Sequence, residues 1–335
     1  MAGLTIGGIR AEAGQVARGW VGAVERPDGT PLGLPVVIVA GAGDGPTLLV
    51  DGAIHGDEPE GPLAIHEVVR RVDPAALRGT IVGVPVMNTA AFEAMARGNP
   101  RDTHSHDMNR IYPGRPEGFL TERIAHVHAT EILAVADLEM SIHSGGNIAY
   151  LAETIFTAAG DARSEELAFA MGEDWPIVFE TPHPSGSPMA AMVKAGKPAI
   201  TVELGGAAIA MADPLRHTTD VLARAILNVC RHYGMLDGTP TYAAAHWRGK
   251  QRVVQATRSG MLQPIAGNRL KTPVAKGEVL LRTTNLLGEV LEELRQPADG
   301  TVFGIRTYPS ITAGDWALFT GEATLVPFDR TRLGR

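Results

Sequence analysis

Strand-length runs of apolar residues recur along the first two thirds of the chain. They predict strands at residues 35–40, 47–54, 79–88, 139–142 and 199–203. In the runs at 35–40 and 47–54 the apolar residues follow one another instead of alternating with polar ones, which is typical of strands buried on both faces. Such strands need layers of helices above and below their sheet.

Apolar residues at helical spacing fill the intervals between these strands. In residues 60–72 they recur every three or four positions, and prolines stand close to the start, where a helix tolerates them. The same spacing predicts helices at about residues 120–136, 162–173 and 214–233. The first of these three has a polar face, on which we expect His126 and His128 to be exposed. Alternating strands and helices up to about residue 234 predict an α/β domain built on a mixed sheet.

The pattern changes after Gly234. Beyond about residue 250, short apolar runs alternate with turn dipeptides such as Lys276-Gly277 and Asp299-Gly300, and no long helix is evident. This pattern predicts a small all-β domain. We therefore expect two domains, an α/β domain over residues 1–240 and a β domain over residues 241–335.

Composition and charge narrow the functional classes. Of the 335 residues, 44% are hydrophobic and 20% are charged, which is ordinary for a folded protein. The net charge of −7 disfavours nucleic acids and anionic membranes as partners. It does not exclude association with further copies of the same chain as a homo-oligomer. Because the sequence shows neither a signal peptide nor an apolar stretch long enough to span a bilayer, we expect a cytoplasmic protein. The single cysteine, Cys230, excludes an internal disulfide and a cysteine-based metal site.

The first candidate site follows the apolar run at 47–54. The residues there read Gly-Ala-Ile-His-Gly-Asp-Glu, which places His55 and Glu58 at a turn from strand to helix. Ligands of open α/β sheets bind at such strand ends. An imidazole and a carboxylate three residues apart supply two of the three protein ligands of a catalytic zinc ion. Taken alone, a pair with this spacing is more often structural.

Two further strand ends carry chemistry of the same kind. His143 follows the run at 139–142 and precedes two glycines, and it would supply the third ligand. Glu203 ends the run at 199–203, also just before a pair of glycines. A carboxylate at the end of a buried strand is costly unless it is paired or functional, and this one suits a general base. Each residue also has a structural explanation, as the partner of a nearby loop or turn.

A polar segment at residues 97–114 contains Arg97, Arg101 and Arg110, with Asn109 next to the last of them. Arginine is the side chain that best matches a substrate carboxylate or a developing oxyanion. Without the other motifs, the segment would be interpreted as a solvated loop.

Taken together, these motifs resemble the succinylglutamate desuccinylase/aspartoacylase family of the zinc carboxypeptidase superfamily. Four motifs in the same order carry the resemblance: His-Gly-Asp-Glu-x-x-Gly at 55–61, the run from arginine to Pro-Gly at 97–114, His-Ser-Gly-Gly at 143–146 and Glu-x-Gly-Gly at 203–206. Residues 85–114 look most like the N-acetyl-diaminobutyrate deacetylase branch. The resemblance implies a zinc-carboxypeptidase-like mixed sheet flanked by helices, followed by a smaller β domain.

The resemblance also implies roles for the strand-end residues. It makes His55, Glu58 and His143 the ligands of one Zn²⁺ ion per chain, and Glu203 the general base. The sequence departs from the family at residue 141, which is serine where the deacylase branch usually has aspartate. Serine is common at this position on the carboxypeptidase side of the superfamily.

In the polar segment, the resemblance implies that Arg97 polarises the scissile carbonyl and that Asn109 and Arg110 bind the substrate carboxylate. About two residues are added here between Asp102 and Asn109. This insertion leaves open whether Arg97 or Arg101 polarises the carbonyl, and we count Arg101 among the substrate-binding candidates.

The C-terminal β domain resembles the barrel-sandwich hybrid of lipoyl- and biotin-carrier domains, on glycine-marked motifs at 273–280, 297–302 and 311–315. A carrier needs a lysine at its hairpin tip, and residues 283–288 contain none, which argues against a carrier role. In the resembling family this domain packs beside the metal site and narrows access to it, which favours small substrates over peptides.

The sequence therefore predicts a zinc-dependent amidohydrolase that removes the acyl group from a small N-acylated amino acid, or a related compound, with a free carboxylate. One alternative is a zinc carboxypeptidase or amidase that cleaves short peptides with the same residues. Another is a non-catalytic binding protein with the same fold. A narrow, capped pocket would favour the deacylase, and an open groove would favour the peptidase.

Overall fold

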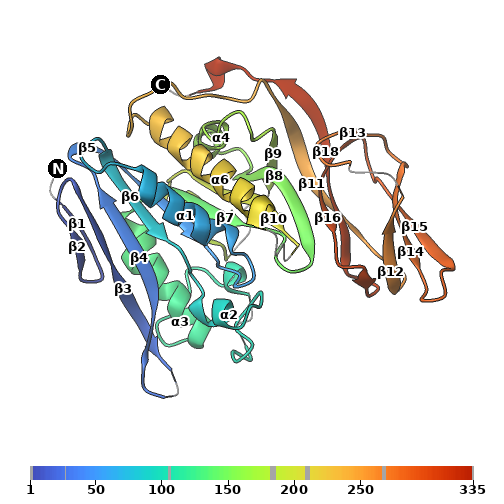
Figure 1. Cartoon of the computed structure of the whole chain (residues 1–335), viewed down its shortest axis with the longest axis horizontal. Coiled ribbons are helices and arrows are strands. Elements are labelled where there is room, and N and C mark those ends of the chain that lie inside the picture. The colour runs from blue at the N-terminus through green and yellow to red at the C-terminus, as the bar shows by residue number, and fades with distance from the viewer. Residues whose placement is uncertain are drawn as a thin grey trace.

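The computed structural model describes residues 3–26, 28–104, 107–181, 186–207, 212–265 and 269–333. Within these residues the central element is a mixed sheet of twelve strands (Figure 1). From one edge to the other the strands are β3 (Gln15–Glu25), β4 (Pro31–Ala40), β6 (Arg78–Val84), β5 (Gly43–Gly52), β7 (Leu138–His143), β10 (Ala199–Gly206), β8 (Ala149–Ala158), β9 (Ile177–Thr181), β11 (Ala245–Gln255), β18 (Trp316–Pro327), β16 (Gly300–Arg306) and β13 (Pro273–Val274).

Four neighbouring strands of this sheet are parallel and carry the apolar runs expected of doubly covered strands. β5 pairs with β6 on one side and with β7 on the other, and β7 pairs with β10. Successive side chains of a strand point to opposite faces, and both faces are filled here: in β5, Leu48 packs into one core and Leu49 into the other. The predicted mixed sheet with strands buried on both faces is confirmed.

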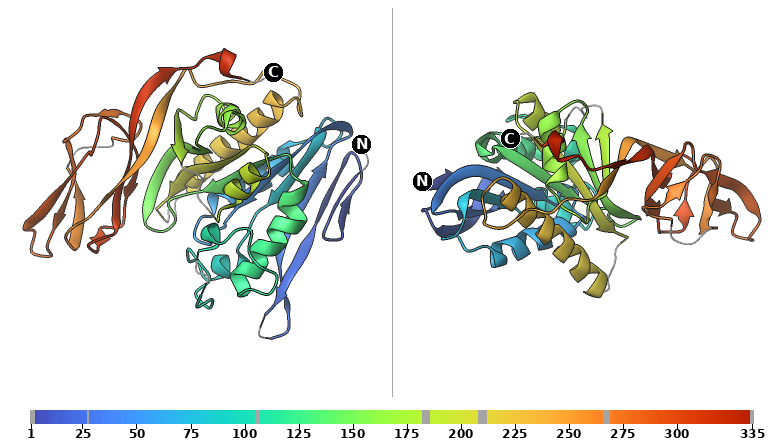
Figure 2. Two further views of the ribbon diagram at one scale, coloured as in Figure 1. Left: turned by 180° about the vertical axis from the view of Figure 1, so that it is seen from behind. Right: turned by 90° about the horizontal axis from the view of Figure 1, so that it is seen from above.

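Helices cover both faces of this part of the sheet (Figures 1 and 2). One face carries α1 (Glu60–Arg71), α4 (Ala162–Phe169) and α6 (Ala212–His232). The opposite face carries α3 (Leu120–Val127) and α5 (Pro188–Lys194). Across the described residues, no helix is both long enough and apolar enough to cross a membrane.

Several elements differ from the expected pattern. The helix expected at 120–136 is α-helical only to Val127, and a π-helical turn (His128–Ile132) and a 3₁₀ turn (Leu133–Val135) continue it. The helix expected at 162–173 ends at Phe169. Strands β3, β8 and β9, the small hairpin of β1 (Leu4–Ile6) and β2 (Ile9–Ala11), α5 and the short helix α2 (Thr89–Glu93) were not expected, because polar or small residues interrupt their apolar positions.

The C-terminal region is all-β, as predicted, and part of it belongs to the central sheet. β12 (Gly260–Pro264), β14 (Val279–Thr284), β15 (Val290–Arg295) and β17 (Ser310–Ile311) form a separate four-stranded sheet. β11 pairs with β9 and β18, and β16 pairs with both β18 and β8. These pairings close β8, β9, β11, β18 and β16 into a ring, whose interior holds four phenylalanines, Phe156, Phe179, Phe303 and Phe319.

A cluster of buried polar side chains includes groups from β5 and β7. His128 Nε2 is 3.2 Å from the Asp51 carboxylate, and His128 Nδ1 is 3.0 Å from the Tyr112 hydroxyl. The expectation that His128 is exposed was wrong, because Asp51 on β5 and Tyr112 give its ring buried partners. Glu139 on β7 joins the cluster. Burial and the neighbouring Asp51 carboxylate raise its pKa well above the usual value.

We expect Glu139→Gln to weaken the dependence of folding stability on pH. Because its pKa is raised in the folded chain, Glu139 keeps its proton to higher pH there than in the unfolded chain. Its contribution to folding stability is therefore complete below the unfolded pKa of about 4.3 and is lost as pH rises toward the folded pKa. The loss amounts to about 1.4 kcal/mol per pH unit until the folded pKa is reached. Glutamine has nearly the same shape as glutamate and has no proton to lose. Urea unfolding at pH 5, 6.5 and 8 measures both slopes, and equal slopes would contradict the assignment.

Candidate metal and active site

Three adjacent parallel strands end together and bring the predicted site residues to one place. His143 is the last residue of β7, and Glu203 on β10 is its register partner. Gly52, the last residue of β5, is the register partner of Ile142, and His55 follows three residues later. The carboxyl ends of parallel strands lie at the same edge of the sheet. The side chains at these three strand ends therefore lie close together.

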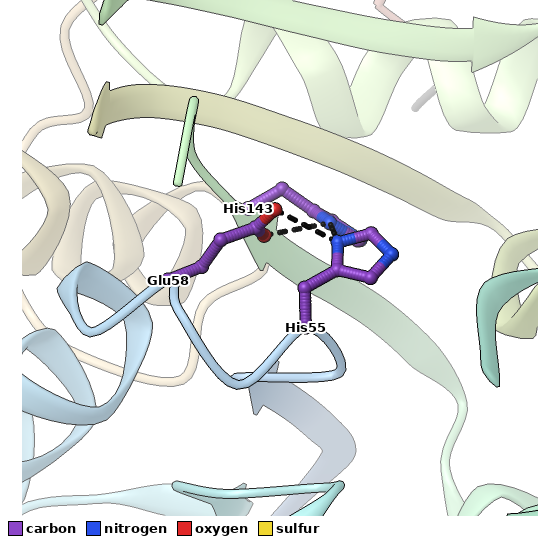
Figure 3. Close-up of side chains that lie close together, drawn as sticks. All are labelled: His55, Glu58 and His143. Carbon is purple, nitrogen blue, oxygen red and sulfur yellow. Dashed lines mark hydrogen bonds and ion pairs between the residues drawn. The ribbon is translucent and has the colours of Figure 1, made fainter. Parts of the chain in front are cut away.

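His55, Glu58 and His143 are buried, and their side chains converge (Figure 3). Glu58 Oε1 is 2.8 Å from His55 Nδ1, Glu58 Oε2 is 3.1 Å from His143 Nδ1, and the two Nδ1 atoms are 3.3 Å apart. A tetrahedral zinc ion with bonds of about 2.0–2.1 Å holds its ligand atoms about 3.3 Å apart. Two nitrogens and a carboxylate at these separations fit a divalent cation.

The second nitrogen of each histidine has a polar partner. His55 Nε2 is 3.1 Å from Asp107 Oδ1, and His143 Nε2 is 3.3 Å from Ser141 Oγ. Metal-binding histidines usually donate their other ring nitrogen to such a group, which fixes the tautomer and the ring orientation. Ser141, at which the sequence departs from the family pattern, can therefore orient the His143 ring through its hydroxyl.

The carboxyl groups around the site differ in charge. The imidazoles of His55 and His143 outweigh burial and hold the pKa of Glu58 well below its usual range, so this residue is ionised, as a ligand must be. Burial and the neighbouring Glu58 carboxylate instead raise the pKa of Glu203 well above its usual value. Glu203 Oε2 has no hydrogen-bond partner among the described residues. A carboxyl group with high proton affinity and a free oxygen is suited to accept a proton.

Two residues that sequence reasoning did not single out hold the site together. Asp107 accepts a hydrogen bond of 3.0 Å from Arg97 while it contacts His55, so it couples the polar segment to a candidate ligand. Glu60, buried at the start of α1, accepts a hydrogen bond of 2.7 Å from the backbone N–H of Gly206. Glu60 therefore anchors the turn that follows Glu203. In the sequence, the only indication that either residue belongs to the site was its place within a motif, 97–114 for Asp107 and 55–61 for Glu60.

The turn after Glu203 depends on glycine. Gly205 has a φ of 91°, a conformation that L side chains rarely adopt, and a Cβ at this position would lie 2.8 Å from Glu60 Oε1. The paired glycines in this motif thus allow the backbone to approach Glu60 closely.

These residues open into one cavity of about 550 Å³. Arg97, Asn109 and Arg110 line it together with the three candidate ligands and Glu203. Arg97 also lies 3.8 Å from Glu58. Arg101 is exposed and is not among the lining residues, so the structure brings Arg97, and not Arg101, to the strand ends.

The chain is similar in sequence to a known family and to a curated protein of that kind. Residues 44–233 match the sequence profile of the succinylglutamate desuccinylase/aspartoacylase catalytic domain. The chain is 30% identical to the N-alpha-acetyl-L-2,4-diaminobutyric acid deacetylase of Halomonas elongata, over 84% of this chain and 83% of that protein.

Two solved structures are similar over nearly the whole chain. One is a succinylglutamate desuccinylase from Silicibacter sp. TM1040, with a TM-score of 0.79, 26% identity, and coverage of 92% of this chain and 95% of that one. The other is the ectoine utilization protein EutE from Ruegeria pomeroyi in a product-bound state, with a TM-score of 0.79, 29% identity, and coverage of 91% and 95%. With its four motifs gathered at one edge of the sheet, the chain belongs to the succinylglutamate desuccinylase/aspartoacylase family.

Proposed function

We propose that the protein is a zinc-dependent deacylase that cleaves the amide bond of a small N-acylated amino acid, with one zinc ion per chain. The convergence of His55, Glu58 and His143 beside Glu203 in one cavity carries this proposal. The acylated substrates named for the relatives support it, since an acyl-amino acid is the substrate in the name of the Halomonas elongata deacetylase.

Each group has a defined task in this reaction. His55, Glu58 and His143 would hold the zinc ion, which when bound supplies Lewis-acid activation of water and of the carbonyl oxygen. Glu203 takes a proton from the attacking water on its free oxygen and passes it to the leaving amine.

When water attacks the amide, negative charge develops on the carbonyl oxygen, and a hydrogen-bond donor stabilises this charge. Arg97 lines the cavity beside Glu58, and its guanidinium can donate to this oxygen. Asp107 keeps the guanidinium in place through the 3.0 Å hydrogen bond.

The shape of the cavity favours the deacylase over a peptidase. Gln251 on β11 and Trp316 and Phe319 on β18 line the cavity, so strands from the C-terminal region close one side of it. A cavity walled off in this way fits a small substrate better than an extended peptide. We test the proposal by supplying the zinc-loaded protein with a panel of N-acyl amino acids and dipeptides and measuring amine release. Cleavage of the dipeptides alone would favour the peptidase.

We expect Arg110→Lys to weaken the binding of substrates that carry a free carboxylate. Arg110 lines the cavity next to Asn109, and a guanidinium forms a paired hydrogen bond with a carboxylate that an ammonium does not reproduce. Losing a hydrogen bond to a charged group costs about 1.5–3 kcal/mol, so KM should rise roughly tenfold to a hundredfold. The matched control is the substrate amide, which never makes the ion pair and should lose little. Equal losses for acid and amide would mean that Arg110 only supports its loop.

A further inference from the structure

Arg110 lines the cavity from the polar segment, and its place there depends on the backbone that carries it. Among the described residues its guanidinium forms no ion pair, and its one hydrogen bond, of 2.8 Å, goes to the carbonyl oxygen of the adjacent Asn109. A long side chain without a protein carboxylate to bind is placed mainly by its own main chain. The contacts that fix this main chain therefore decide where the guanidinium can meet a substrate.

Two contacts hold the main chain directly after Arg110. The backbone N–H of Tyr112 donates a hydrogen bond of 2.9 Å to the carbonyl oxygen of Gly186. Gly186 has a φ of 88°, and a Cβ at this position would overlap the carbonyl oxygen of Arg110, so the two backbones are in close contact. The second contact is made by the Tyr112 side chain, whose hydroxyl is 3.0 Å from His128 Nδ1.

The Tyr112 hydroxyl is the first member of a buried chain of hydrogen bonds. His128 lies between Tyr112 and Asp51, and its Nε2 is 3.2 Å from the Asp51 carboxylate. A carboxylate beside Nε2 favours the tautomer with the proton on that nitrogen, so Nδ1 accepts a hydrogen bond from the Tyr112 hydroxyl. All three side chains are buried. Because no water replaces a partner lost at such a depth, the chain of hydrogen bonds holds the Tyr112 ring firmly.

This chain ends at the strands that carry the candidate metal ligands. Asp51 precedes the last residue of β5, and it is the register partner of Ser141 on β7. The Ser141 hydroxyl is in turn 3.3 Å from Nε2 of His143. Asp51 therefore fastens the Tyr112 ring to the same part of the sheet that positions His143.

We propose that Tyr112 and His128 are positioning residues that hold Arg110 at a fixed place relative to the candidate metal ligands. The inference rests on the carboxylate-binding role proposed for Arg110. Neither Tyr112 nor His128 lines the cavity, so both act on the substrate through the main chain at Arg110. A guanidinium that is already in place loses less conformational freedom when the carboxylate binds, which strengthens binding.

Tyr112→Phe tests this anchor, because it removes the hydroxyl and keeps the ring that fills the core. In the zinc-loaded protein, KM for an N-acyl amino acid should rise roughly tenfold, since the guanidinium is displaced but not removed. The value of kcat should change little. The carboxamide of the same substrate makes no ion pair with Arg110, so its KM should stay at the parent value. A purely structural Tyr112 would affect the acid and the amide alike, and that result would overturn the inference.

A second chain of the same composition provides a matched control. The Tyr242 hydroxyl is 2.9 Å from His232 Nδ1, and His232 Nε2 is 3.0 Å from the Glu166 carboxylate. None of these three residues lines the cavity. Tyr242→Phe removes the same kind of hydrogen bond, and it should leave KM for the acid and for the amide at the parent values. An equal rise for the acid in Tyr242→Phe would overturn the assignment of the effect to Arg110.

A double-mutant cycle shows whether Tyr112 acts through Arg110. Once Arg110→Ala has removed the guanidinium, adding Tyr112→Phe should raise KM for the acid no further. Two rises that multiply would mean that Tyr112 acts independently of Arg110. That outcome, like an unchanged KM in the single variant Tyr112→Phe, would overturn the inference.

A binding measurement separates this inference from the proposed function. N-methylsulfonylglycine, which is not cleaved, and its carboxamide are titrated calorimetrically into the zinc-loaded parent and into Tyr112→Phe. A preference of the parent for the acid that falls roughly tenfold in Tyr112→Phe supports the inference even if no substrate is hydrolysed, in which case the proposed function alone fails. No preference for the acid in the parent, or an equal preference in both proteins, overturns the inference even if the deacylase is active.

Discussion

Replacing Glu203 with glutamine should leave zinc binding intact and lower kcat by about 10²–10⁴-fold. Glutamine has the shape of glutamate but does not take up the proton of the attacking water. The free Oε2 of Glu203 has no partner among the described residues, so the substitution breaks no hydrogen bond there. The loss should therefore fall on the chemical step, and KM should change little. Stopped or continuous assays of amine release, with zinc measured by atomic absorption, check both halves of the expectation.

The matched control for this variant is Glu180→Gln. Glu180 lies on β9 of the same sheet, but it is exposed and does not line the cavity. The Glu180→Gln variant should turn over substrate at the rate of the parent protein. If Glu203→Gln also turned over at a rate near that of the parent, another group would have to move the proton, and the proposed mechanism would be wrong.

The second large effect concerns the metal. The purified protein should contain about one zinc ion per chain, and both His55→Ala and His143→Ala should lose it together with activity. Each substitution leaves two of the three ligands of a site that needs three protein groups. The Glu58 carboxylate would also lose one of the two imidazoles that now lie within 3.1 Å of it. Zinc content after dialysis against a weak chelator, followed by a titration with added zinc, measures the affinity.

His66→Ala provides the control for nonspecific zinc loss. His66 lies on α1 a few residues after the ligand motif, and its side chain is exposed. This variant should retain the full zinc content of the parent. Full occupancy in His55→Ala and in His143→Ala would refute the ligand assignment.

Much of the α/β architecture could be predicted because burial leaves a local pattern. The strands at 35–40 and 47–54 were recognised since both of their faces are covered, which favours apolar residues at successive positions. β8 was not recognised. Some of its side chains are polar, such as Glu153, and they interrupt the apolar run. Others, such as Phe156, pack with the phenylalanines inside the ring of strands.

The candidate site shows the same division. The motifs predicted that His55, Glu58, His143 and Glu203 would gather, and the structure places them at neighbouring strand ends. Their roles stay predictions until the variants are measured. Between the two candidate arginines the sequence left a choice, because about two residues are added between Asp102 and Asn109, and only the structure shows that Arg97 lines the cavity.

Sequence by itself determined what is encoded locally: the covered strands, the flanking helices, the all-β C-terminal region, and the residue types that stand at each strand end. The tertiary structure alone decided which distant groups meet. It buries His128 between Asp51 and Tyr112, sets Asp107 against His55, and brings Trp316 from β18 to a cavity that begins at β5. Such contacts depend on strand order and on closure of the ring through β16 and β8, which no spacing along the chain records. The division at residue 240 stays a prediction, since strands from both sides of it share one hydrogen-bonded sheet.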